Sequence, residues 1–517
     1  MPTPASAQNE LGVISLAQGG IYRNGFYDVK YYDGVYGRFW PGAMGFQEMM
    51  GDIIGAEAAN AYENQIGCPN KVTLDNGTVV LNPSAINTQY GLLRTVNKNA
   101  QSGSNPTYYE WAYMYNMIVA ANTVLDITSK TTFSGAGATT KAATLQAWAY
   151  FWKGFAYAHI GSIYYAGLIQ NSLQSFTNGN YVSKDAIIAE SNANFDKASA
   201  ALDAAASATD YTTVFAQLVP TFLQKGKGGV LTTAMFRHNI STMKARNILV
   251  NTTVSAMTSA QWNSILTLTA AGITSTDLIF TGRSDANGDF LGAGISVADK
   301  ASSPVTSTGG YKLSERFVQE FKAGDKRKTN NVLTLANAGL GIFNQDRGNS
   351  FNTRYTLSNK GTGVAGTIVY ANSDAGGNEI TLAGTYEENE LMKAEANLKL
   401  GNIATGLASV DAVRTYQGAG ISAVSGVVTD AAAAYEEFRR ERRVALAFKG
   451  LSFYDARRWE IIDPAKSRTG CVVVAASGAV NTNATINYGF LDYWDVPDNE
   501  LAYNPASATS APVKNPK

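Results

Sequence analysis

Only two histidines, His159 and His238, occur in the 517 residues of the chain, and this limits its acid–base and metal chemistry. A histidine-rich metal site is excluded, and a Ser–His–Asp triad requires one of the two. His159 follows the aromatic run of residues 148–157, which predicts a packed position in the core or at its rim. His238 lies in a predicted helix beside Arg237, and the sequence contains no G-x-S-x-G nucleophile elbow. We therefore expect no hydrolytic triad.

Four glutamates lie close together near residue 390 and could supply the carboxylate pair that glycoside hydrolases use. They are Glu387, Glu388, Glu390 and Glu395. Acidic residues are also favoured in the first turns of a helix, where they interact with the helix dipole, and a helix is predicted over 387–400. We interpret the glutamates as helix-stabilising and the chain as a non-enzyme. A glycoside hydrolase stays an alternative, which a cleaved oligosaccharide would establish.

The run Asp285-Ala-Asn287-Gly-Asp289 is similar to the start of a calcium-binding loop. An EF-hand requires Gly at the sixth position and Glu at the twelfth, where this chain has Phe290 and Ser296. A solvated turn is predicted here, with a calcium site of another kind as the alternative. No resident metal and no cofactor are expected.

Aromatic and polar side chains in the long loops offer a binding surface instead. A sugar ring has an apolar face that docks on aromatic rings and hydroxyls that Asn, Asp and Arg side chains can bind. The predicted ligand-binding residues fall into two loop-rich segments, one before the first long helix and one in the middle of the chain. They are Tyr90, Arg94, Tyr108, Tyr109, Phe280, Arg283, Asp285, Asn287, Phe290 and Tyr311.

Helices must position these loops, and several carry explicit start signals. Thr107–Glu110, Thr258–Gln261 and Thr385–Glu388 each have the spacing of a capping box. The helix predicted over 142–160 places large aromatic residues beside Ala and Gly, which indicates close packing against another helix. Periodicity also predicts helices over 184–206 and 232–251, and a helix, tight turn and helix over 387–400 and 403–414.

The spacing of these helical pairs predicts an all-α fold, a TPR-like stack of helical pairs with a large irregular insertion that contains short strands. We expect one domain over residues 1–517, with a helical core at about 108–272 and 385–460. Loop-rich insertions are expected at about 62–106 and 273–384, with β-like runs at Thr367–Tyr370 and Glu379–Leu382. Loops of this length are usually either functional or disordered, and their many aromatic residues favour function.

The composition excludes several classes of protein. Hydrophobic residues make up 45% of the chain, which indicates a globular protein, and charged residues make up 16%, below the roughly 25% of typical soluble domains. Lys plus Arg (41) equals Asp plus Glu (41), so no net charge attracts nucleic acid or anionic lipid. No run of 18 apolar residues predicts a membrane span. The two cysteines, Cys68 and Cys471, either form one disulfide or stay buried thiols.

Residues 435–459, YEEFRRERRVALAFKGLSFYDARRW, form the most distinctive segment of the chain. The pattern predicts an amphipathic helix that ends at Gly450, followed by an aromatic-rich one. The pairs Glu436–Arg440 and Asp455–Arg458 have the spacing of ion pairs along a helix. We interpret these charges as structural.

This segment resembles the C-terminal signature of the SusD/RagB family. The resemblance is carried by Arg440, Glu441, Arg442, Arg443, Leu446, Phe448, Gly450, Asp455, Arg457, Arg458 and Trp459. The chain departs from the usual pattern at Ala445 and Lys449, where acidic residues are common, and at Ser452, where arginine is common. A second similarity lies in Pro497, Glu500, Asn504 and Pro505, and a third in the helix and turn over 143–169.

The resemblance implies a surface nutrient-binding lipoprotein of Bacteroidetes that captures an oligosaccharide and passes it to a partner SusC-like TonB-dependent transporter, with hinged closure over the transporter. It implies a lipid anchor on the extracellular face of the outer membrane, through a lipidated cysteine that we expect to precede Met1. A peptide-binding member of the family and a TPR-type protein-interaction scaffold are the further alternatives.

Overall fold

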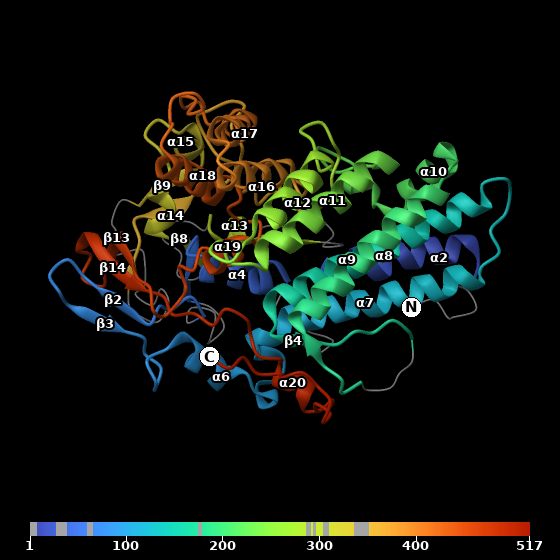
Figure 1. Cartoon of the computed structure of the whole chain (residues 1–517), viewed down its shortest axis with the longest axis horizontal. Coiled ribbons are helices and arrows are strands. Elements are labelled where there is room, and N and C mark those ends of the chain that lie inside the picture. Colours follow the sequence, from blue (N-terminus) through green and yellow to red (C-terminus); the bar gives the residue numbers. More distant parts are fainter. Residues whose placement is uncertain are drawn as a thin grey trace.

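The structure is a computed structural model, and it describes residues 8–26, 39–58, 66–173, 178–285, 291–292, 296–302, 310–335 and 351–517. Helices supply most of its regular structure, and small sheets supply the rest (Figure 1). Among the described residues, no helix is both long and apolar enough to cross a bilayer.

The longest helices lie side by side in one half of the molecule (Figure 1). They are α7 Pro106–Lys130, α8 Ala138–Ile163, α9 Lys184–Ala204 and α11 Thr233–Val250. Shorter helices are α2 Glu10–Leu16, η1 Ala17–Arg23, α3 Asn24–Phe26, η3 Phe39–Met44, α4 Gly45–Met50, α10 Ala208–Leu218 and η5 Thr221–Leu223.

An aromatic core holds α8 in place. Trp148, Phe151, Trp152 and Phe155 are at most 1% exposed and make tilted or edge-to-face ring contacts with one another and with neighbouring helices. A Cβ added to Gly154 would lie 2.9 Å from the Phe195 ring on α9, so the two helices approach where the side chain is smallest. The close packing predicted for this helix is confirmed.

The predicted caps differ in outcome. Thr258 and Gln261 form a complete capping box at the start of α12 Ser259–Ala270. Thr385 accepts a hydrogen bond from the Glu388 amide at the start of α16 Tyr386–Lys399. The box at Thr107 is wrong, because Asn105 caps α7 and the favoured first-turn proline Pro106 follows it.

The second helical group contains the predicted helix, turn and helix. α16 is followed by Gly401, whose φ of +86° closes the turn into α17 Ile403–Tyr416. The remaining helices are α6 Gln89–Val96, η4 Asn99–Ser104, α13 Val297–Lys300, α14 Glu315–Val318, α15 Lys326–Asn331, α18 Ala431–Ala445, α19 Ser452–Arg458 and α20 Asp498–Leu501.

An antiparallel five-stranded sheet shows that the all-α prediction is wrong in part: the chain is largely helical with small sheets. Its order is β10 Phe351–Asn352, β13 Arg468–Ala475, β14 Val480–Asn487, β2 Lys71–Thr73 and β3 Val79–Leu81. Buried Val72 pairs with Ile486 on one side and Val80 on the other, so residues near 72 and 486 are neighbours in space. Cys68 and Cys471 are separate buried thiols rather than a disulfide.

Short strands elsewhere join loop segments. They are β1 Ile54–Ala58 with β8 Gly310–Leu313, β4 Ala166–Gly167 with β5 Val182–Ser183, β9 Val332–Thr334 with β11 Tyr355–Leu357, and β12 Glu379–Thr381 with β6 Thr281–Asp285 and β7 Leu291–Gly292. The β-like run at Glu379–Leu382 is therefore confirmed as β12. The run at Thr367–Tyr370 is not a strand; it forms bends and irregular loop.

Candidate functional site

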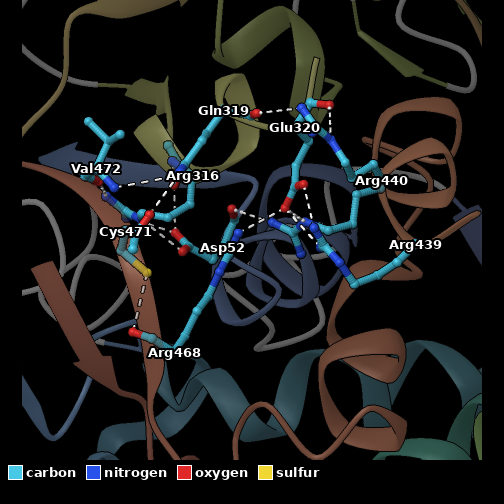
Figure 2. Close-up of polar contacts among 12 residues, drawn as sticks. Asp52, Arg316, Gln319, Glu320, Arg439, Arg440, Arg468, Cys471 and Val472 are labelled. Atoms are coloured by element: carbon cyan, nitrogen blue, oxygen red, sulfur yellow. Dashed lines mark hydrogen bonds and ion pairs between the residues drawn. The ribbon is translucent and has the colours of Figure 1, made fainter. Parts of the chain in front are cut away.

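Two groups of charged residues are candidates for function, and the first is buried. Asp52, 3% exposed, accepts hydrogen bonds from Arg316 Nη2 at 2.8 Å, from Arg316 Nε at 2.9 Å and from the Tyr488 hydroxyl. Glu320 pairs with Arg439 at 2.7 Å and with Arg443 at 3.1 Å. Figure 2 shows Asp52 beside Arg316, with Glu320 and Arg439 nearby.

The pKa of Glu320 shows how strongly these pairs act. Burial raises the pKa of this carboxyl, but the Arg439 hydrogen bond and the charges of Arg468 and Arg443 outweigh it, and the pKa is lowered to about 2. Glu320 is therefore ionised at neutral pH inside the protein. Charge-assisted bonds of this kind hold segments together and leave the carboxylate saturated.

The C-terminal signature extends this group of buried pairs. Glu441 accepts from Arg327 at 2.6 Å and from Arg414 at 2.9 Å. The Asp455 carboxylate accepts hydrogen bonds from Arg442 Nε at 2.8 Å and from Arg458 Nε at 2.7 Å. The predicted Asp455–Arg458 pair is therefore confirmed. We call the set Asp52, Arg316, Glu320, Arg327, Glu395, Arg414, Arg439, Glu441, Arg442, Arg443, Asp455, Arg458 and Arg468 the arginine network.

The other predicted pair, Glu436–Arg440, is wrong. Glu436 instead pairs with Arg439, three residues along the helix rather than four, and Arg439 Nε donates to its carboxylate at 2.7 Å. Arg440 turns to the end of α14 and donates to the carbonyls of Gln319 and Glu320, both at 3.1 Å. A helix end leaves carbonyls without partners inside the helix, and the guanidinium satisfies them.

The second group lines a cavity of about 760 Å³. Its wall comes from segments far apart in sequence: η3, the loops at 227 and 273–279, β6, α13, the loop at 360–378, β12, the facing ends of α16 and α17, and the connection from α18 to α19. The volume lies in the range of small-molecule binding sites. This cavity is the candidate functional site.

An aromatic pair forms one part of the cavity wall. Tyr386 begins α16 and Tyr416 ends α17, and because the two helices form a hairpin these ends meet. The rings are edge-to-face with centroids 4.9 Å apart, and Tyr416 is 37% exposed. Burial and the charge of nearby Glu387 raise the pKa of Tyr416 to about 12, so its hydroxyl keeps its proton and can donate a hydrogen bond.

A rigid ion pair forms a second part of the wall. Arg283 on β6 lies opposite Glu379 on β12, and Arg283 Nη2 is 2.9 Å from Glu379 Oε1. The same oxygen accepts the amides of Lys227 at 2.9 Å and Gly228 at 3.0 Å. A Cβ on Gly226, whose φ is +68°, would lie 2.3 Å from Arg283 Nη2, so the turn requires glycine.

Glu387 and Lys449 form a third part. Lys449 Nζ is 3.1 Å from Glu387 Oε1, which also accepts from Gln417 Nε2 at 3.1 Å. Burial raises the pKa of Glu387, but the Lys449 charge and the hydrogen bonds outweigh it, and the pKa is lowered from its ordinary value. The wall thus combines aromatic faces with fixed donors and acceptors.

Of the predicted ligand-binding residues, only Arg283 lines the cavity among those described. Asp285 ends β6, and Asn287 and Phe290 lie outside the described residues, as does most of the calcium-like run. Arg94 stacks over Tyr90 and pairs with Asp495 at 3.0 Å. Tyr108 is half-buried on α7.

Three of the predicted aromatics are closed to a ligand in this structure. Tyr109 stacks on Phe46 with ring centroids 5.6 Å apart, and Tyr311 is 3% exposed. Phe280 is 1% exposed, with its ring centroid 4.7 Å from that of Phe151. Tyr109 on α7, Tyr311 on β8 and Phe280 before β6 all lie in the core, where burial of large rings is favourable. These three are therefore packing residues.

The four glutamates considered for hydrolysis are each paired with a cation. Glu387 meets Lys449, and Glu388 is 2.5 Å from Arg246. Glu390 meets Lys393 and Glu395 meets Arg458, both at 2.7 Å. His159, predicted to be a core histidine, is 9% exposed and bonded to Glu110 at 2.6 Å, which confirms its position.

Sequence reasoning missed Tyr386, Tyr416, Lys227 and Lys449. The available signal was the predicted hairpin itself: residues at the start of its first helix and the end of its second lie together. Lys227 gave no signal, because its place beside Tyr416 depends on contacts between segments 189 positions apart.

Comparisons with known proteins agree with this architecture. The sequence model of the SusD family matches residues 297–507. No curated protein matches the chain. The fold is similar to a SusD-like carbohydrate binding protein from Bacteroides vulgatus ATCC 8482, with 13% identity, 98% of each chain covered and a TM-score of 0.58.

Two more solved structures are similar. One is a SusD-like carbohydrate binding protein from Bacteroides fragilis NCTC 9343, with 15% identity, coverage of 96% of this chain and 98% of that chain, and a TM-score of 0.56. The other is a SusD superfamily protein from Bacteroides thetaiotaomicron VPI-5482, with 12% identity, coverage of 98% and 99%, and a TM-score of 0.56. At these identities the likeness establishes the fold.

Proposed function

This chain belongs to the SusD family, and on that premise we propose that it binds an oligosaccharide in the cavity and releases it chemically unchanged. The observation that carries the proposal is the Tyr386–Tyr416 pair in the wall of a 760 Å³ cavity that also holds fixed polar groups. Aromatic faces suit the apolar faces of sugar rings, and the polar groups suit their hydroxyls.

The rigidity of the polar groups supports the proposal. Arg283 and Glu379 are fixed across a strand pair, and Glu387 is fixed by Lys449 and Gln417. Groups that are already ordered lose little entropy when a ligand binds, so their hydrogen bonds contribute more to affinity. The paired state of the nearby glutamates also fits binding without hydrolysis.

Related features complete the proposal. We propose that the protein is anchored by lipid on the extracellular face of the outer membrane and delivers its ligand to a SusC-like TonB-dependent transporter. We also propose that its helical pairs form a TPR-like stack. Co-purification with a transporter and recovery in the outer-membrane fraction would support delivery and anchoring, and recovery only as a protein without membrane or partner would contradict them.

The test of ligand binding is native mass spectrometry of the chain with a panel of oligosaccharides and short peptides. An intact sugar adduct is expected, and a shorter product would overturn the proposal in favour of hydrolysis. Tyr386→Ala and Tyr416→Ala should each weaken binding roughly three- to tenfold, the contribution of one aromatic contact. Tyr503→Ala is the matched control, because Tyr503 is 77% exposed and outside the cavity wall.

A further inference from the structure

The lysines of the cavity wall differ from its arginine in how far their charges are satisfied. Arg283 is matched by Glu379 and also donates to the carbonyls of Gly376 at 3.3 Å and Lys225 at 3.1 Å. Its charge is therefore used within the protein. Lys360, at the exposed rim, is matched by Asp374 at 2.6 Å. Of the two other lysines of the wall, Lys227 has no carboxylate within ion-pair distance among the described residues, and Lys449 shares the Glu387 carboxylate with Gln417.

Lys227 presents a cation beside the aromatic pair. Its amide is fixed by Glu379, and its ammonium lies 5.4 Å from the centre of the Tyr416 ring and donates to the Ser275 carbonyl at 2.5 Å. Among the described residues, no carboxylate lies within ion-pair distance of this ammonium. An ammonium group has three donor hydrogens, so two stay available for a ligand.

Lys449 presents a second cation in the cavity wall. Its only carboxylate partner among the described residues is Glu387, at 3.1 Å, and Gln417 shares the accepting oxygen. Two of its donor hydrogens are likewise available. The remaining acid of the wall, Asp277, is turned to His238 at 2.8 Å and to the Thr274 amide at 2.8 Å.

Contacts join these groups in the wall: Lys227 lies beside the Tyr416 ring, Tyr416 packs against Tyr386, and Lys449 pairs with Glu387, the residue that follows Tyr386. Two cations with spare donors therefore share the wall with a pair of aromatic rings. A neutral sugar uses the rings and leaves the cations to water. A sugar that carries a carboxylate can stack its ring on the aromatic side chains and accept charge-assisted hydrogen bonds from the lysines.

We propose that the cavity selects acidic oligosaccharides, in which carboxylates on the sugar rings bind Lys227 and Lys449 while the rings pack on Tyr416 and Tyr386. This inference rests on the proposed function and specifies its substrate class.

Isothermal titration of the full chain with tetragalacturonate and with neutral galactotetraose of equal length tests the inference. We expect tetragalacturonate to bind at least about tenfold tighter, with the difference shrinking as salt rises from 20 to 200 mM because ions screen the charges. Lys227→Gln and Lys449→Gln should each weaken tetragalacturonate binding about tenfold and weaken galactotetraose binding by less than about threefold, because the neutral sugar makes no charge-assisted bond with either lysine. The control is Lys466→Gln, an exposed lysine paired with Glu460 outside the cavity wall.

The outcomes separate the two proposals. Equal binding of both sugars, or tighter binding of the neutral one, would overturn the acidic class and leave oligosaccharide capture standing. If folded Lys227→Gln and Lys449→Gln variants bind tetragalacturonate as tightly as the parent does, its carboxylates bind outside the cavity. That result would overturn the cavity as the binding site of the acidic sugar. Binding of no sugar in the panel would overturn both. Circular dichroism identifies variants that have lost their fold.

Discussion

The arginine network and the cavity wall both contain many charges, but they use them in opposite ways. In the network the guanidiniums meet buried carboxylates, and Asp52, Glu320, Glu441 and Asp455 each bind at least one arginine at 3.1 Å or less. In the wall, the ammonium groups of Lys227 and Lys449 each donate one hydrogen bond within the described structure.

The chemistry of the two cations explains the division. A guanidinium is a planar fork that matches two carboxylate oxygens at once, whereas an ammonium is a point charge with three separate donors. Arginine is therefore suited to ion pairs that link chain segments. Lysine can donate one hydrogen bond to a protein group and still donate to a ligand. Arginines paired with buried carboxylates indicate architecture, and lysines with spare donors in a cavity indicate binding.

The largest effect should follow from breaking a buried pair. Asp52→Ala leaves Arg316 buried without its carboxylate and removes acceptors of Ser314 and Tyr488. We expect a loss of about 3–5 kcal/mol in the free energy of unfolding, measured by denaturant titration. A loss below about 1 kcal/mol would show that the network is not structural.

A buried carboxylate without an arginine partner sharpens the comparison. Glu48 is 0% exposed and accepts from the Gly450 amide at 2.7 Å and the Ser452 hydroxyl at 3.2 Å. Burial raises its pKa to about 7, although these hydrogen bonds and the charge of Arg443 oppose the rise. This is the reverse of the shift at Glu320.

The sign of the pH dependence follows from that pKa. Between pH 4.5 and 7 the unfolded chain has lost the Glu48 proton and the folded one keeps it, so stability falls as pH rises, by about 3 kcal/mol from this group. Glu48→Gln removes the contribution, so the stability of the variant relative to the parent should increase as pH rises across this range. Denaturant titrations at pH 5 and 7.5 measure it, and a pH-independent difference between the two proteins would contradict the shift.

A smaller effect is expected in the cavity wall, where water reaches the charges. Lys449→Glu places a second carboxylate beside Glu387, which raises the pKa of both acids. We expect a loss of roughly 1–2 kcal/mol at pH 7, when both are ionised, and recovery as the pH falls through the raised values. Equal losses at pH 7 and pH 4 would instead indicate damaged packing.

The smallest effect should come from an exposed pair. Asp126 and Lys130 on α7 are 2.7 Å apart, with side chains 37% and 57% exposed. Asp126→Ala should cost less than about 0.5 kcal/mol, because solvent screens the charges. The difference should disappear in 1 M salt, and it serves as the baseline against which the loss at Asp52 is judged.

Local signals predicted local structure well. The capping box at Thr258 and the hairpin turn at Gly401 depend on residues within a few positions of each other, and both are as expected. The capping box predicted at Thr107 is wrong because a second helix-start signal lies two residues earlier. Asn105 caps the helix there, and Pro106 occupies its first turn. Arg440 failed because the carbonyls that attract it lie more than 100 positions away.

The candidate site was harder to predict for the same reason. A search for aromatics in long loops selected Phe280, which the Trp148–Phe151 core takes up, since burying a large ring is favourable. Two of the aromatics that line the cavity, Tyr386 and Tyr416, belong to helix ends, where periodicity suggests packing. Sequence reasoning could identify the helical hairpin but not the loops that meet it.

The five-stranded sheet has a consequence for how the chain reaches its fold. Its central pairing joins Val72 to Ile486, so β2 has no partner in β14 until nearly the whole chain has been synthesised. Bringing together strands so far apart in sequence costs conformational entropy before the contacts between them stabilise the chain. Contacts of this kind therefore form late in folding. The β2–β3 hairpin must therefore wait, with the edge of β2 that faces β14 unpaired, for the arrival of the C-terminal strands. During that interval a chaperone that shields strand edges would have the most to protect.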